Sequence, residues 1–285
     1  SACLVGSEMC IRDRIRIRQF TDGPAGLQPF DLSDRGLLLA DGVFDTSRVV
    51  DGRIVLMEAH IERLQNDAAA LGIEVDLETL RRFALEAIPD DEAGALRLTV
   101  TRGPGPRGVA PNALGMPTLI SKFDPGAPAL PLPPTRLMTS DIWRNPTAPS
   151  SRRKTLAYTD AVIGTQRARE AGFDDALYLT PQGHAACTSI ANIFARFDNA
   201  LVTPPLEDGV VNGIMRDWLI REAGNNGFNV SVASLSIDAL HSADAIYLTN
   251  SLQLVRATES LDETAFNTTL PEPLLDACRA LLKEA

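Results

Sequence analysis

Five prolines fall within residues 124–134 (DPGAPALPLPP), near the middle of the chain. Proline lacks a backbone N–H and has a fixed φ, so this stretch cannot continue a helix or a central strand. We therefore expect it to be a linker that separates a smaller N-terminal domain, residues 15–123, from a larger domain, residues 135–285.

The opening segment, residues 1–14 (SACLVGSEMCIRDR), resembles translated sequencing-adapter read-through. We expect it to be a leader that is foreign to the protein, and a genuine N-terminal arm is the alternative. It is therefore left out of the functional interpretation, together with Cys3 and Cys10.

The composition excludes several classes of partner. The 285 residues are 45% hydrophobic, enough to bury a core, and the formal net charge is −10. Such an acidic chain is a poor match for nucleic acid or an anionic membrane, so we expect neither as a partner. No apolar run approaches the roughly 20 residues that a spanning helix needs, and we expect a cytoplasmic protein. The histidine and cysteine spacings fit no metal site, so no metal is expected.

Hydrophobic periodicity predicts helices and strands on both sides of the linker. Asp51-Gly52 is a strong hairpin signal between two strands. Before the linker we expect strands at 42–50, 53–56 and 95–101 and helices at 57–71 and 77–88. After it we expect helices at 158–171, 214–223 and 273–283 and strands at 176–179, 190–197, 200–202 and 245–249. This mixture is typical of an α+β protein.

Lysine is scarce, which narrows the candidates for amine chemistry. The only lysines are Lys122, Lys154 and Lys283, and every other basic residue apart from histidine is arginine. Lys283 lies near the end of the chain and Lys122 lies beside the proline-rich stretch. Lys154 is therefore the candidate for a reactive amine.

Three glycines, Gly103, Gly105 and Gly108, spell the GxGxxG pattern of a dinucleotide site directly after a predicted strand. Such a site needs a helix that begins at the glycine turn, and the surrounding prolines predict a loop instead. Arg102 and Arg107 flank this loop and could bind a substrate carboxylate as a fork. Solvation at the surface is the alternative role for at least one of them.

Five segments in order along the chain carry a family resemblance: 34–52 with 58–64, 152–162 (RRKTLAYTDAV), 186–194, 209–217 (GVVNGIMRD) and 249–252 (TNSL). Together they resemble the fold type IV pyridoxal-phosphate enzymes of the class IV aminotransferase family. That family includes D-amino acid and (R)-amine transaminases and 4-amino-4-deoxychorismate lyases. The resemblance implies an α+β fold with a small N-terminal α/β domain, a larger C-terminal domain with a barrel-like mixed sheet, and a homodimer.

The resemblance also implies a cofactor, pyridoxal 5'-phosphate, carried by Lys154 as a Schiff base. It places the cofactor phosphate on Arg63, whose guanidinium matches phosphate oxygens. Further phosphate contacts are implied for Ile214, Met215, Ser251 and Leu252. Tyr158 is expected near the cofactor, with ordinary helix packing as the alternative.

One position departs from the family pattern. Five residues before Asn192, where relatives carry a glutamate that protonates the cofactor's ring nitrogen, this chain has Cys187. A thiol is a weak hydrogen-bond donor and cannot replace a carboxylate as an anionic partner unless it is ionised. We expect a weakly held ring nitrogen; the alternative is that another acid fills this role in space.

The resemblance leaves the reaction open. We favour a transaminase that moves an amino group between an amino acid or amine and a ketoacid. A 4-amino-4-deoxychorismate lyase, which releases pyruvate, is the close alternative. A protein that binds the cofactor without catalysis is a third, because the ring-nitrogen acid is replaced.

Overall fold

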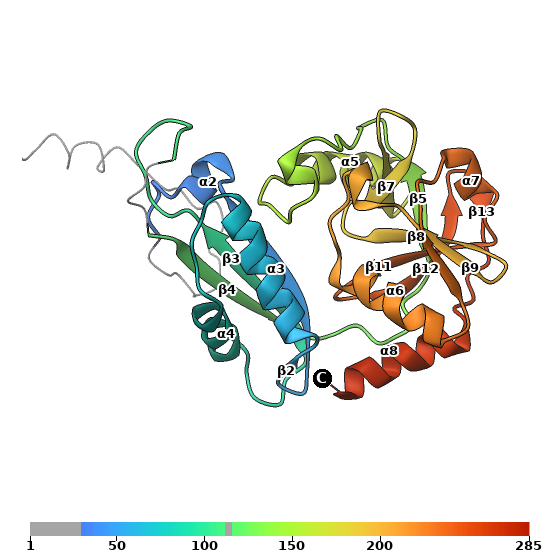
Figure 1. Ribbon diagram of the computed structural model, residues 1–285, viewed down its shortest axis with the longest axis horizontal. Helices are drawn as coiled ribbons and strands as arrows, with labels where there is room; N and C mark the ends of the chain where they lie inside the picture. Colours follow the sequence, from blue (N-terminus) through green and yellow to red (C-terminus); the bar gives the residue numbers. More distant parts are fainter. Residues whose placement is uncertain (1–29, 112–115, 285) are drawn as a thin grey trace, which may run out of the picture.

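The computed structural model describes residues 30–111 and 116–284 (Figure 1). The expected leader, residues 1–14, lies outside the described residues. Two β-sheets organise the described chain, one on each side of the proline-rich segment. No helix in these two ranges is long and apolar enough to cross a membrane.

The first sheet has four antiparallel strands in the order β2-β1-β3-β4. Its strands are β1 (Gly42–Val50), β2 (Arg53–Ile54), β3 (Gly94–Thr101) and β4 (Thr118–Pro125). Asp51 and Gly52 both have positive φ, as the predicted hairpin turn requires. A short helix, α2 (Arg35–Leu39), precedes β1.

Two helices, α3 (Met57–Ala70) and α4 (Leu77–Glu86), cover one face of this sheet (Figure 1). Side chains alternate along a strand, so Val43 and Val49 of β1 reach the core beneath the helices while Phe44, Thr46 and Arg48 lie on the opposite face. That opposite face lies toward the second sheet, because Val50 packs against its core.

The second sheet is mixed and closes on itself. Its order is β10-β9-β8-β11-β12-β5-β6-β7, and an additional β7–β8 pairing closes β5, β6, β7, β8, β11 and β12 into a barrel. The strand β5 pairs in parallel with both β12 and β6, whereas β11 is antiparallel to β8 and β12. The expected α+β class with a barrel-like mixed sheet is therefore confirmed.

The strands of this sheet are β5 (Thr135–Thr139), β6 (Asp175–Leu179), β7 (Ala185–Thr188), β8 (Asn192–Phe197), β9 (Ala200–Thr203), β10 (Asn229–Val232), β11 (Ala245–Asn250), β12 (Leu254–Leu261) and β13 (Thr264–Ala265). The helices are α5 (Thr159–Glu170), α6 (Ile214–Asn225), α7 (Ile237–His241) and α8 (Glu272–Glu284). Helices α6 and α8 pack against the barrel through Trp218, Leu219 and Leu274.

Most predicted elements are present, with shifted ends. The strand expected at 190–197 begins at Asn192, because a turn separates it from β7. The strand β4 runs through Asp124 and Pro125, the first two residues of the expected linker. The division into domains at 124–134 stays a prediction.

Candidate active site

The backbone around Lys154 is fastened to β1. The Lys154 carbonyl accepts a hydrogen bond from the Phe44 N–H at 2.9 Å, and the Leu156 N–H donates to the Gly42 carbonyl at 3.0 Å. Val43 and Thr155 form an antiparallel bridge between these two contacts. The lysine, which follows the proline-rich segment, is thereby held against a strand that precedes it.

The Lys154 amine lies against two aromatic side chains. Its Nζ is 3.3 Å from the Tyr158 hydroxyl and 4.4 Å from the centre of the Phe44 ring. The two rings meet edge to face at 5.1 Å. In the described part of the chain, no carboxylate forms an ion pair with this amine. The structure therefore brings together Lys154 and Tyr158, both predicted, and Phe44, which was not.

Arg97 of β3 also lies at this site, and the sequence did not single it out. Its guanidinium stacks on the Phe44 ring, 3.6 Å from the ring centre. Burial lowers the pKa of Arg97, because a desolvated guanidinium loses hydration. The sequence does carry a signal for Arg97. Apolar and polar residues alternate along 95–101, so Arg97 lies on the face of the strand opposite the core residues Leu96 and Leu98.

A buried acid, Asp45, lies next to Phe44 in β1. Its carboxylate is 2.6 Å from His60 Nδ1 and 2.7 Å from Arg63 Nη2. Burial by itself raises the pKa of Asp45, but the charges of Arg63, His60 and Lys154 outweigh it and hold the pKa at about 2. The guanidinium of Arg63 is therefore bound to Asp45, and its contact with the cofactor phosphate stays a prediction.

We expect Asp45 to make the unfolding free energy of the protein depend on pH under acidic conditions. Its pKa in the fold is below the ordinary value of 3.8, so its stabilisation is present above about pH 4 and is lost as the pH falls toward 2. A shift of this size corresponds to about 2 kcal/mol of unfolding free energy. Urea unfolding at several pH values measures it.

In the Asp45→Asn variant, the fall in unfolding free energy across that pH window should be smaller by this amount. Equal falls in the variant and the parent protein would show that Asp45 does not cause the acid sensitivity.

The start of α6 is the second part of the candidate site. Its N-cap is Gly213, which supplies no side-chain cap, and the first helical residues, Ile214 and Met215, are buried. The free N–H groups at a helix start, together with the helix dipole, suit a phosphate. A Cβ on Gly213 would lie 2.0 Å from Asn192 Oδ1, so a larger residue there would require the Asn192 side chain to shift.

The TNSL segment lies beside this helix start. Thr249, at the end of β11, pairs in register with Asn192 of β8, the residue that contacts Gly213. The Thr249 hydroxyl is buried and has no hydrogen-bond partner among the described residues. An unpaired buried hydroxyl beside an uncapped helix start fits the phosphate of pyridoxal phosphate.

The other two predicted phosphate residues follow in the β11–β12 turn. Ser251 is partly buried, and the Leu252 N–H donates to Asn250 Oδ1 at 3.1 Å. The Leu252 carbonyl accepts from Arg48 Nη1 at 2.7 Å. The Leu252 amide is thus already engaged, and its phosphate contact stays a prediction.

Cys187 lies in β7, between Tyr178 of β6 and Asn192 of β8. Burial raises the pKa of its thiol, and the nearby charge of Arg144 only partly offsets this effect. The thiol is therefore protonated near neutral pH, and Cys187 supplies no negative charge. Its expected place at the ring nitrogen stays a prediction.

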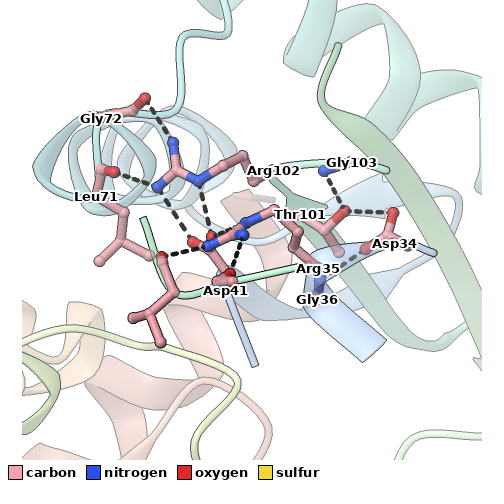
Figure 2. A network of polar contacts seen from close by, with 11 residues as sticks. Asp34, Arg35, Gly36, Asp41, Leu71, Gly72, Thr101, Arg102 and Gly103 are labelled. Carbon is pink, nitrogen blue, oxygen red and sulfur yellow. Dashed lines mark hydrogen bonds and ion pairs between the residues drawn. The ribbon is translucent and has the colours of Figure 1, made fainter. Parts of the chain in front are cut away.

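The two arginines of the glycine loop differ in their surroundings. Arg102 donates from Nε to Asp41 at 2.8 Å and from Nη1 to the Gly72 carbonyl at 3.0 Å, which ties β3 to the end of α3 (Figure 2). Arg107 is exposed in the loop. The structure therefore gives Arg102 a structural role, and the role of either arginine toward a substrate stays a prediction.

The same Asp41 also binds Arg35, the first residue of α2, at 2.8 Å (Figure 2). Arg35 in turn donates to the carbonyls of Gly108 at 2.9 Å and Val109 at 2.8 Å, so it holds the glycine loop. Burial raises the pKa of Asp41, but hydrogen bonds and charge from both arginines lower it below its ordinary value. One carboxylate thus joins α2 to the end of β3, and Arg35 extends the network to the glycine loop.

Comparison with known proteins places the chain in a family. The model of amino-transferase class IV matches residues 42–261, more than half of the chain. An aminodeoxychorismate lyase of Bacillus subtilis (strain 168) is 30% identical over 260 residues, which cover 87% of this chain and 86% of the relative. A D-alanine aminotransferase of Bacillus licheniformis is 26% identical over 269 residues, which cover 90% of this chain and 91% of the relative.

A solved structure agrees with the fold. The branched-chain amino acid aminotransferase of Escherichia coli superposes with a TM-score of 0.82 at 21% identity, over 89% of this chain and 90% of that chain. At this identity the likeness concerns the fold alone. The chain therefore belongs to the class IV aminotransferases, a family of pyridoxal-phosphate-dependent enzymes.

Proposed function

We propose that this enzyme is a transaminase in which Lys154 carries pyridoxal 5'-phosphate and moves an amino group between an amino acid and a ketoacid. The observation that carries the proposal is the position of the Lys154 amine. It lies against Phe44 and Tyr158, on a backbone that β1 holds in place. A lysine amine held in one place is the group that attacks a carbonyl to form a Schiff base.

Different residues around Lys154 would bind the phosphate and the ring of the cofactor. The amides of Ile214 and Met215, with Thr249, Ser251 and Arg63, would hold the phosphate, and Tyr158 would lie beside the ring. When bound, pyridoxal phosphate supplies an electron sink for negative charge at the substrate Cα. Lys154 would then carry the proton that leaves Cα, because its amine is the base fixed at this position.

A carboxylate-bearing substrate fits the charges at the site better than a bare amine. Arg97 stacks on the Phe44 ring, against which the Lys154 amine also lies. Burial lowers the pKa of Arg97, and no ion pair within the described ranges compensates its charge. Arg48, by contrast, already donates to two backbone carbonyls at 2.7 Å each.

The Arg97→Met variant tests this assignment. Loss of a charged hydrogen bond costs about 1.5–3 kcal/mol, so the KM for amino acids should rise roughly 10- to 100-fold while kcat changes less. Steady-state kinetics with an amino acid and with a matched amine that lacks the carboxylate measures the effect. Arg53→Met, at an exposed arginine of β2, is the control. Equal effects on the two substrates would show that Arg97 does not bind the substrate carboxylate.

A lyase is the second candidate. The similarity to the Bacillus subtilis aminodeoxychorismate lyase over 87% of this chain favours it. Such an enzyme would use the same lysine but would expel pyruvate and leave an aromatic amine. The expected homodimer and cytoplasmic location stay predictions.

One experiment separates the two candidates. The absorbance band of the cofactor-loaded protein is recorded before and after adding D-amino acids, L-amino acids or an (R)-amine, and the products are analysed. Loss of the band with a new ketoacid or ketone supports transamination and gives its handedness. An unchanged band with all of them, together with pyruvate release from 4-amino-4-deoxychorismate, would establish the lyase instead.

A further inference from the structure

A second buried carboxylate, Asp67 of α3, is not used by the chemistry described so far. It is 4% exposed and has two partners. Asp67 Oδ2 accepts a hydrogen bond from the backbone N–H of Lys154 at 3.0 Å, and Oδ1 accepts from Arg153 Nη1 at 3.3 Å. A helix of the N-terminal half thus contacts the reactive lysine through its main chain.

The Lys154 backbone is therefore bound on both sides. Its carbonyl accepts from the Phe44 N–H of β1, and its N–H donates to Asp67 of α3. The side chain is left to reach between Phe44 and Tyr158. Asp67 follows Arg63 by four residues, so the two lie on the same face of α3, one turn apart.

The position of Asp67 is energetically unfavourable for a carboxylate. Burial raises its pKa, although the Lys154 N–H, Arg153 and Arg63 all act to lower it. A raised pKa means that the charged form is less stable in the fold than in the unfolded chain. Positions that cost stability in this way are often functional.

We propose that Asp67 is a positioning residue that fixes the backbone of Lys154, so that the lysine amine stays within reach of the reacting carbon. The proposal rests on the proposed function, in which Lys154 is that amine. The hydrogen bond to the Lys154 N–H carries the effect, and the ion pair with the partly exposed Arg153 contributes little.

Two substitutions of Asp67 separate the hydrogen bond from the charge. Asp67→Ala removes the acceptor, and kcat should fall on the order of 10²-fold with KM little changed, because small displacements of a reacting group have effects of this size. Asp67→Asn keeps an oxygen that accepts from the Lys154 N–H, so kcat should stay within about threefold of the parent enzyme. Glu62→Gln, at an exposed acid of the same helix, is the control and should change neither constant.

Amide hydrogen exchange gives a readout that needs no turnover. The Lys154 amide should exchange at least about tenfold faster in Asp67→Ala but not in Asp67→Asn, because only the former loses the acceptor. The Leu156 amide, bonded to the Gly42 carbonyl, is the internal reference and should be unchanged.

Three results would overturn the proposal: a parent-like kcat in Asp67→Ala, unchanged exchange at Lys154, or a hundredfold loss of kcat in Asp67→Asn. The last would mean that the charge matters and not the backbone contact, and it decides the question even if Asp67→Ala does not fold. Absence of transamination in the parent enzyme would refute the proposed function, while the exchange result would still report on Asp67.

Discussion

Replacing Lys154 by alanine is expected to lower kcat by about 10⁴-fold or more and to leave the fold intact. Positioned proton transfer alone contributes about 10²–10⁴-fold, and the variant also loses the amine that we propose to carry the cofactor. Among the described residues the side chain bonds to Tyr158 and lies over the Phe44 ring, so its removal costs little stability. The backbone contacts with Phe44 and Asp67 do not depend on the side chain.

The scarcity of lysine provides a matched control for this experiment. Lys122 lies on β4 with 67% of its side chain exposed, where it pairs with Asp124. Lys122→Ala should therefore keep parent-like activity. Reduction of the cofactor-loaded protein with borohydride, followed by peptide mapping, should label Lys154 alone among the three lysines. Label on Lys122 or Lys283, or activity in Lys154→Ala, would refute the assignment.

Replacing Asp41 by alanine is expected to lower the free energy of unfolding by about 3–5 kcal/mol, because it leaves two largely buried arginine charges without their anionic partner. The Arg35 side chain is 4% exposed and that of Arg102 13%, and both donate to this single carboxylate (Figure 2). Arg35 also holds Gly108 and Val109, so the glycine loop should become more accessible to protease. Urea unfolding and limited proteolysis measure the two effects.

An exposed ion pair of similar geometry is the control. Asp141 and Arg167 approach to 2.6 Å, but their side chains are 72% and 49% exposed. Asp141→Ala should cost less than about 1 kcal/mol, because water compensates an exposed charge. A loss of stability in Asp41→Ala no larger than that in Asp141→Ala would show that the network of Figure 2 does not stabilise the fold.

Local signals in the sequence predicted much of the fold. The hairpin at Asp51-Gly52 and the helix that begins at Met57 follow from turn chemistry and from a 3.6-residue apolar period, which depend on neighbours along the chain. The start of α6 after Gly213 is equally local. Lys154 stood out because lysine is rare in this chain.

The pairing of strands that are distant in the sequence was harder to predict. The parallel contacts of β5 with β12 and β6 join segments far apart in sequence, and the strands β7 and β10 have only four residues each, too few for a clear periodicity. Closure of the barrel depends on the β7–β8 pairing, which rests on a single residue pair, Cys187 with Asn192. Such contacts depend on the packing of the whole sheet and not on any local pattern.

By itself, the sequence determined the local elements of this protein, its one central lysine and, through ordered motifs, its family. Only the tertiary structure decided what surrounds that lysine: Phe44 and Arg97 from the first sheet, and Asp67 from α3. In the sequence, each of these residues occupies an ordinary position in a strand or a helix. Their roles arise because the Lys154 segment crosses back to pair with β1, and a contact between segments more than a hundred residues apart follows from the packing of both halves.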